Sequence, residues 1–286
     1  MFSRVLRHTH GALMGWVFFL QPAGLAVAPA VTPHAKVTLV SEKTSIQPGH
    51  DIRVGLRFEL EKDWHIYWIN PGDSGQPPRV EWKLPPQFHA GPLEWPAPRR
   101  LENGPLVDYG YENEVLLMSA IRAPADIEPG GTAKLEANIK WLVCYDICIP
   151  ERQTVTLALP VVRDGAKSDS GWISLFARAR DKLPKRAPAV WNVTAVSNQE
   201  SFVLTIRTGT REPSATFFPL TPLQIEDAAT QQASPFNQGI RLSLRKSEKL
   251  LQPLDSLKGV LVLDHGKVYE ISAPVVSEGR PGKSSD

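Results

Sequence analysis

Apolar and polar residues alternate along most of this chain, and this period of two constrains the fold more than any other feature. In residues 35–60, AKVTLVSEKTSIQPGHDIRVGLRFEL, two alternating runs flank a QPGH turn signal. The alternation returns in VLLMSAIRAP, TAKLEANIKWLV and QTVTLALPVV, between residues 115 and 162. Such alternation is typical of β-strands with one buried face, so the sequence predicts a mainly β protein built from antiparallel sheets.

Proline and glycine set the length of these elements. The chain has 26 prolines and 20 glycines among 286 residues, which favours short elements joined by many turns. Both residue types, together with tryptophan, are dense in residues 70–114, where long loops and short edge strands are expected rather than helices. We therefore predict that residues 31–165 form one domain, an immunoglobulin-like antiparallel β-sandwich.

The periodicity changes within residues 168–185, where apolar residues recur at spacings of three and four. This spacing places them on one face of an α-helix, so residues 166–188 are predicted to form a helical linker packed against a neighbouring element. Asp169 and Ser170 are candidate N-caps, and Pro184 is expected to end the helix. The apolar face comprises Trp172, Leu175, Phe176, Ala179 and Leu183.

A second β region follows the predicted helix. Alternation returns in AVWNVTAVSNQESFVLTIRTG, GIRLSLRKS and KGVLVLDHGKVYEISAPVV, so residues 189–276 are predicted to form a second, smaller β domain. Residues 277–286, SEGRPGKSSD, are polar and offer little to a core, and we expect them to form a disordered tail.

The first residues have the pattern of a secretory signal. Arg4 and Arg7 precede the apolar stretch GALMGWVFFL, and the small residues of LAVAPA then suit cleavage after Ala28 or Ala30. Residues 1–30 are therefore predicted to be a signal peptide, and the mature chain to be a soluble periplasmic protein. An uncleaved anchor is the alternative, although the apolar stretch is about half of the roughly 20 residues that cross a bilayer.

Charge and glycine motifs exclude two classes of function. The chain has 32 basic and 30 acidic side chains, a net charge of +2 that is too balanced for a nucleic-acid-binding surface. The glycines of NPGDSG, residues 70–75, lie in no strand–loop–helix context for phosphate binding, so we interpret them as a turn. The sequence predicts no cofactor.

The chain has only two cysteines, Cys144 and Cys148, in WLVCYDICIPE. A disulfide that closes so short a ring contributes only about 2 kcal/mol of stability, whereas its local placement near a strand end keeps it accessible for exchange. A metal site would need further ligands, which His65, His89 or Met118 would have to supply through the fold. From these residues alone, a redox couple, a structural disulfide and half of a metal site all remain open.

Four segments together resemble a known family: WHIYWINPGDSGQPPRVEW, LEWPAP, DYGYENEV and WLVCYDICIPERQTVTLALP. They are similar to the periplasmic N-terminal domain of the thiol:disulfide interchange protein DsbD family. The similarity is greatest to its ScsB-like branch, the suppressor of copper sensitivity proteins. The second β region, with FFPL and LKGVLVLDHGKVYEISAP, also resembles that branch.

The resemblance implies a thiol:disulfide oxidoreductase component that needs no cofactor. Its cysteine pair would accept electrons from a membrane-embedded DsbD/CcdA-like donor and pass them to thioredoxin-fold or other oxidised periplasmic clients. Cys148 would be the nucleophile and Cys144 the resolving thiol, although the best-known members space their cysteines further apart. The alternatives are a secreted β-sandwich binding module with a structural disulfide, and a copper-binding protein of the copper-tolerance type.

The residues expected to shape the site follow partly from this resemblance. His65 and Tyr67 match positions near the family's active site, and Tyr109 matches a loop that caps the cysteines. Asp108 stands where the best-known member has an aromatic residue, so Tyr109 or Tyr111 is the candidate cap. Asp146, inside the cysteine ring, adds negative charge that disfavours a thiolate.

Overall fold

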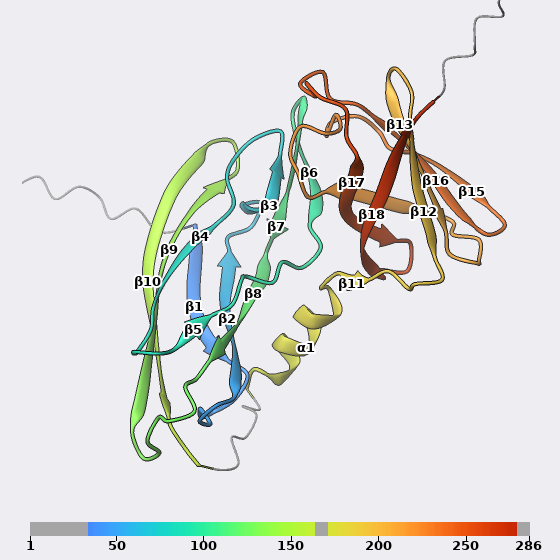
Figure 1. Ribbon diagram of the computed structural model, residues 1–286. Helices are drawn as coiled ribbons and strands as arrows, with labels where there is room; N and C mark the ends of the chain where they lie inside the picture. Colours follow the sequence, from blue (N-terminus) through green and yellow to red (C-terminus); the bar gives the residue numbers. More distant parts are fainter. Residues whose placement is uncertain (1–33, 164–170, 279–286) are drawn as a thin grey trace, which may run out of the picture. The chain divides into compact units, whose positions relative to one another are not determined.

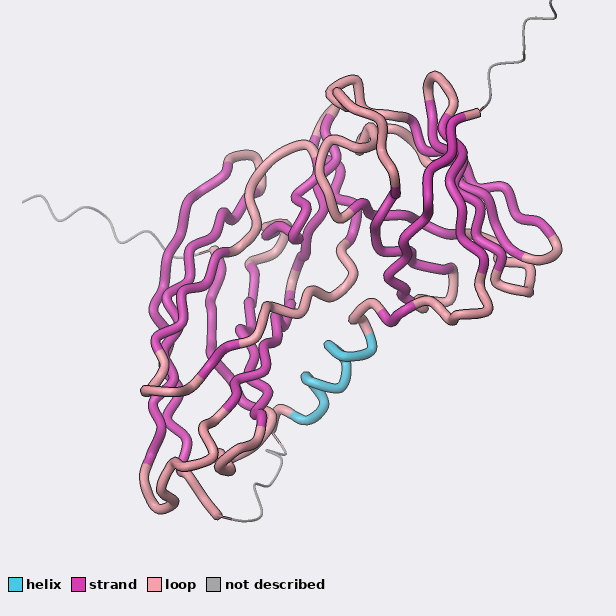
Figure 2. The backbone as a smooth tube through the Cα atoms, viewed as in Figure 1, coloured by secondary structure: helices cyan, strands magenta, loops and turns pink. Residues whose placement is uncertain are grey.

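The computed structural model describes residues 34–163 and 171–278 of the chain. These residues are mainly β-strand with a single helix, which confirms the predicted fold class (Figure 2). No helix in these two ranges is long and apolar enough to cross a membrane. The predicted signal peptide, the candidate helix caps Asp169 and Ser170, and most of the predicted tail lie outside the described residues.

Two antiparallel sheets form the first β region (Figure 1). The four-stranded sheet has the order β1-β2-β8-β5, and a six-stranded sheet has the order β10-β9-β3-β7-β6, with β4 paired to β9. The strands of the first sheet are β1 (Ala35–Ser41), β2 (Asp51–Leu60), β5 (His89–Ala90) and β8 (Glu114–Arg122). Those of the second are β3 (His65–Gly72), β4 (Arg79–Lys83), β6 (Arg99–Asn103), β7 (Leu106–Glu112), β9 (Thr132–Cys144) and β10 (Cys148–Pro160).

The two sheets enclose one core made by the alternating residues that the sequence pattern indicates. Val54 and Leu56 of β2 are fully buried in it, as are Leu135 and Val143 of β9. Because successive residues of a strand point to opposite faces, the residues between them lie on the outer faces of the sandwich. The immunoglobulin-like sandwich predicted from the sequence is therefore confirmed.

The helix and the second β region follow in chain order. Helix α1 (Ile173–Asp181) buries Leu175 and Phe176 beside Leu116 and Met118 of β8, and so covers the outer face of the four-stranded sheet. An eight-stranded sheet then has the order β14-β17-β18-β12-β13-β16-β15, with β11 paired to β18. Its strands are β11 (Lys185–Arg186), β12 (Asn192–Ser197), β13 (Ser201–Arg207), β14 (Ala215–Pro219), β15 (Gln232–Phe236), β16 (Gly239–Arg245), β17 (Ser256–Leu263) and β18 (Val268–Ser277). The exact residue limits of the predicted domains stay a prediction.

An aromatic cluster joins the eight-stranded sheet to the sandwich. Phe218 of β14 packs edge-on against Tyr109 of β7, with ring centroids 5.1 Å apart, and against Trp68 of β3 at 6.2 Å. All three side chains are almost completely buried. Since buried aromatic rings contribute large apolar areas, this cluster fixes β3 and β7 against the second β region.

Two buried hydrogen bonds reinforce the same junction. The hydroxyl of Tyr109 donates to Oδ1 of Asp227 at 2.7 Å, and the amide of Asn70 donates to the carbonyl of Pro219 at 2.7 Å. Burial raises the pKa of Asp227 to about 6, an effect that the Tyr109 hydrogen bond opposes. The second β region therefore places a carboxyl group that titrates near pH 6 against the sandwich.

Asp227 should make stability depend on pH in a defined direction. Its pKa in the folded protein lies above the value of 3.8 for a free side chain, so the folded state binds the proton more tightly. The free energy of unfolding should therefore fall as pH rises from about 4 to about 6, by up to about 3 kcal/mol from this group. Asp227→Asn should gain stability relative to wild type over that range, measured by urea unfolding, whereas Asp255→Asn, at an exposed site, should not. Parallel pH curves for wild type and Asp227→Asn would contradict this account.

Candidate functional site

The two cysteines lie at the end of the β9–β10 hairpin. Cys144 is the last residue of β9 and Cys148 the first of β10, and the strand register places them directly opposite one another. They form a disulfide with Cα atoms 4.2 Å apart, across a turn of three residues. The register from this rung to Pro160 is continuous, so backbone pairing aligns the two strands over the whole hairpin.

The two cysteines differ in exposure. Cys144 is completely buried, whereas Cys148 is exposed to solvent. The turn between them carries Tyr145 and Ile147, which are 50% and 65% exposed. An incoming thiolate can therefore approach Cys148, and the disulfide lies beside an exposed apolar tip.

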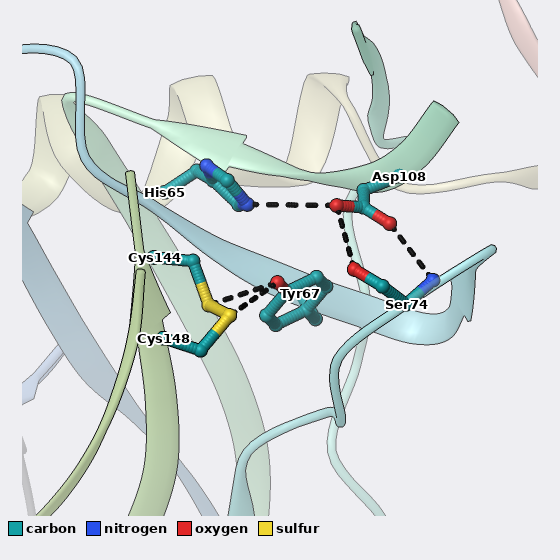
Figure 3. Close-up of a disulfide and its surroundings, with 6 residues drawn as sticks. All are labelled: His65, Tyr67, Ser74, Asp108, Cys144 and Cys148. Atoms are coloured by element: carbon teal, nitrogen blue, oxygen red, sulfur yellow. Dashed lines mark hydrogen bonds and ion pairs between the residues drawn. A yellow bond between two sulfur atoms is a disulfide. The ribbon is translucent and has the colours of Figure 1, made fainter. Parts of the chain in front are cut away.

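A buried tyrosine contacts both sulfur atoms (Figure 3). The Tyr67 hydroxyl donates a hydrogen bond to Sγ of Cys144 at 2.9 Å and lies 3.3 Å from Sγ of Cys148. The Tyr67 side chain is completely buried, and burial raises its pKa above 10.0. The phenol therefore keeps its proton at neutral pH and is a hydrogen-bond donor to sulfur.

Strand β3 presents this tyrosine because its two faces have different neighbours. Ile66 and Trp68 point into the sandwich core, so His65 and Tyr67 point to the opposite face. His65 lies opposite Cys144 in the register, and its ring packs edge-on against Tyr67 with centroids 5.2 Å apart. The strand thus places both side chains beside the cysteine pair.

The imidazole of His65 is neutral in this setting. Burial lowers its pKa below 6.5, an effect that the nearby carboxylates of Asp108 and Glu112 oppose. Nε2 of His65 lies 3.9 Å from Oδ2 of Asp108 and has no hydrogen-bond partner among the described residues. The ring therefore brings no positive charge to the disulfide at neutral pH.

A loop after β3 holds Tyr67 in place (Figure 3). The register between β3 and β7 shifts by several residues, which brings Gly72 opposite Asp108. Ser74 then donates to Asp108 twice, from its backbone N–H to Oδ1 at 2.9 Å and from its hydroxyl to Oδ2 at 3.0 Å. Gly75, with φ of +75°, lies against the Tyr67 ring so closely that a Cβ there would stand 2.0 Å from Cζ. Only glycine lets the loop cover the phenol in this way.

The two tyrosines expected to cap the cysteines are bonded elsewhere. Tyr109 points toward the second β region, and the Tyr111 hydroxyl donates to the carbonyl of Pro96 at 2.7 Å. Both side chains are buried, so the expectation that one of them caps the disulfide gains no support from this arrangement. Asp146 is exposed in the turn between the cysteines. Of the predicted site residues, the structure brings together His65, Tyr67, Cys144 and Cys148.

Three residues of the site were not predicted from the sequence. Ser74 and Gly75 belong to the NPGDSG segment, whose pattern indicates only a turn, and Asp108 stands where the best-known family member has an aromatic residue, which gives it no predicted role. Asp108 is completely buried and accepts both hydrogen bonds of Ser74. The sequence shows both a carboxylate in β7 and a Gly-Asp-Ser-Gly loop after β3. Their pairing could not be predicted, because it depends on the register shift between β3 and β7.

Metal ligands do not gather at the cysteines in the described parts of the chain. No group of three or more His, Cys, Asp or Glu side chains that could hold a metal ion is present there. Of the three candidate further ligands, His65 lies beside the cysteines, whereas Met118 is buried in the cluster beneath α1 and His89 lies on β5 of the other sheet.

The fold and the site together define a β-sandwich domain with one buried and one exposed cysteine, joined by a disulfide at the end of a hairpin. Residues 36–160 match the family model described as thiol:disulfide interchange protein DsbD, N-terminal. This match confirms the resemblance to the DsbD N-terminal family that the sequence segments indicate. The match includes both sheets of the sandwich and both cysteines.

Solved structures extend the comparison to the second β region. The N-terminal periplasmic domain of ScsB from Proteus mirabilis has a TM-score of 0.66 and 16% identity, and the alignment covers 88% of this chain and 97% of that one. At this identity the likeness shows a shared fold. The periplasmic chaperone SfaE (10% identity, covering 85% of this chain and 100% of that one) and the Bacillus cereus pilin BcpA (7%, 85% and 68%) have TM-scores of only 0.23 and 0.28. No curated protein sequence matches the chain.

Removing the Tyr67 hydroxyl should slow reduction of the disulfide. When Cys144 leaves as a thiolate, the hydroxyl that contacts its sulfur stabilises the new charge more than it stabilises the neutral disulfide. Tyr67→Phe should therefore be reduced by dithiothreitol roughly five- to tenfold more slowly, measured by stopped-flow tryptophan fluorescence. Tyr111→Phe, which removes a hydroxyl bonded to Pro96, is the matched control and should react at the wild-type rate. Equal rates for the two variants would show that the Tyr67 contact is without chemical effect.

Proposed function

We propose that this protein is a periplasmic carrier of thiol–disulfide exchange that passes electrons from a membrane reductant to oxidised client proteins. The observation that carries the proposal is the asymmetry of the cysteine pair. Cys148 is exposed, while Cys144 is buried with its sulfur against the Tyr67 hydroxyl. This arrangement suits a disulfide in which one sulfur is attacked and the other leaves.

The first half of the cycle reduces the carrier. A thiolate of the donor attacks Sγ of Cys148, the bond between the two cysteines breaks, and Cys144 leaves as a thiolate beside Tyr67. The donor's second thiolate then attacks the donor sulfur that is bonded to Cys148. This step forms the donor's disulfide and releases Cys148 as a thiolate. The carrier gains two electrons, and two protons from solvent complete the dithiol.

The second half of the cycle reduces the client. The Cys148 thiolate attacks a client disulfide and forms a mixed disulfide, releasing one client thiolate. Cys144 then attacks Sγ of Cys148, which re-forms the internal disulfide and releases the second client thiolate. Since the two cysteines face each other across one rung of the hairpin, the resolving step needs little movement of the backbone.

A permanent structural disulfide fits the same geometry less well. The hairpin pairs thirteen residues of each strand, from Cys148 and Cys144 to Pro160 and Thr132. A ring of this size contributes only about 2 kcal/mol through the unfolded chain, and the hairpin register already aligns the strands. The bond therefore adds little to the fold, while its exposed end leaves it open to exchange.

The family match supports the proposed partners, and the signal pattern supports the proposed compartment. The match to the DsbD N-terminal family supports a membrane-embedded DsbD/CcdA-like donor and thioredoxin-fold or other oxidised clients. The predicted signal peptide supports transport out of the cytoplasm into the periplasm. The periplasm is oxidising, so the carrier would be reoxidised there if no donor supplied electrons.

Single cysteine variants test the assigned roles. Cys144→Ser keeps the exposed cysteine and lacks the resolving thiol, so it should accumulate a mixed disulfide with oxidised glutathione. Cys148→Ser keeps only the buried cysteine and should form at least tenfold less adduct in the same time. Intact-mass spectrometry under non-reducing conditions measures both, with the double serine variant as the blank. Equal trapping by the two variants, or trapping by neither, would refute the assignment.

A further inference from the structure

Three basic side chains form a row across β4, β9 and β10, in the same sheet as the disulfide. Arg79 of β4 lies opposite Lys140 of β9, which in turn lies opposite Arg152 of β10. Directly opposed residues point to the same face of a sheet, so the three cations project together from its outer face. All three are exposed. We call these residues the cation row.

The cation row has no internal counter-charge. None of its members forms a salt bridge in the described residues, whereas further along the same face Lys83 and Lys134 both pair with Glu136. Like charges placed opposite one another destabilise a sheet, and a neutralising carboxylate would relieve this cost. The fold gains nothing from leaving the row unpaired, so the charge is available to a partner.

The cation row shares its sheet face with the disulfide. Side chains alternate along a strand, so Lys140, Leu142 and Cys144 point to one face of β9. The row lies four positions from the disulfide along β9 and along β10, a distance of about 13 Å. Leu142 and Pro150 form the rung between them.

A groove runs over the same surface. It has a volume of about 460 Å³ and is lined by the cation row together with Leu142, Pro150 and Glu151, among others. Glu151 is the only carboxylate among the lining residues, and its Oε1 already accepts a hydrogen bond from the backbone N–H of His34. The groove is therefore positively charged, and its lining residues Leu142 and Pro150 lie two positions from the cysteines along their strands.

We propose that the cation row binds an acidic segment of the redox partner and so guides the partner's cysteine to Cys148. This inference rests on the proposed function and names the chemistry of the partner's docking segment. An extended segment with carboxylates about four residues from its cysteine matches the spacing between the row and the disulfide. The exposed Ile147 at the hairpin tip then contacts apolar residues beside the partner's cysteine. Complementary charge of this kind mainly raises the rate of encounter, and salt weakens it.

Cysteine peptides of different charge test the docking step. An acidic peptide of about ten residues, with glutamates about four residues from its cysteine, should reduce the wild-type disulfide about tenfold faster than a peptide with glutamines instead. The preference should disappear at about 0.5 M salt. The triple variant Arg79→Gln, Lys140→Gln, Arg152→Gln should lose the preference while reacting with the glutamine peptide at the wild-type rate.

A matched control separates the cation row from net charge. Arg207→Gln, Arg241→Gln and Lys267→Gln together remove the same charge from exposed sites in the second β region and should keep the preference. Equal loss in both triple variants, or no preference in wild type, would overturn the proposal.

A binding measurement keeps this inference distinct from the proposed function. The acidic peptide with serine in place of cysteine should bind wild type and the control variant, and bind the cation-row variant about tenfold more weakly, by fluorescence anisotropy at low salt. This result does not depend on thiol chemistry, so it stands even if no peptide reduces the disulfide. Equal binding to all three proteins would refute the docking site.

Discussion

A buried hydroxyl needs a hydrogen-bond partner, and the hydroxyl of Tyr67 lies against two sulfur atoms. The rest of the site supports this contact. Strand β3 turns the phenol away from the core, Gly75 lets the following loop lie on its ring, and Ser74 ties that loop to the buried Asp108. If the ring moved, the buried sulfur of Cys144 would lose its hydrogen-bond donor.

The second β region also contacts β3 and β7, the strands that carry Tyr67 and Asp108. Asn70, just before the loop, donates to Pro219, and Tyr109, next to Asp108, donates to Asp227. Phe218 packs against Trp68 and Tyr109 between these two hydrogen bonds. The strands that carry the site are therefore held both by their own sandwich and by residues more than a hundred positions away in the chain.

How far the sequence predicts this arrangement depends on the range of each interaction. The alternation of β3 predicts two faces, and the cysteine spacing predicts a local ring, because both are properties of a single segment. The covering of Tyr67 by Gly75 depends on a register shift between β3 and β7, which no local pattern reveals. Tyr109 was expected near the cysteines, but its partner Asp227 is 118 residues away, in the second β region. The cation row, likewise, is visible only once β4 is known to pair with β9.

The central claim is that the bond between Cys144 and Cys148 is a redox couple rather than a structural bridge, and its reduction potential tests this most directly. The purified protein would be equilibrated with defined glutathione and dithiothreitol couples, and the fraction of dithiol measured after acid quenching and thiol alkylation. A carrier should titrate reversibly as a two-electron couple between about −270 and −120 mV, the range spanned by strong biological reductants and periplasmic oxidants. A disulfide that stays oxidised until the potential falls below about −300 mV would contradict the account.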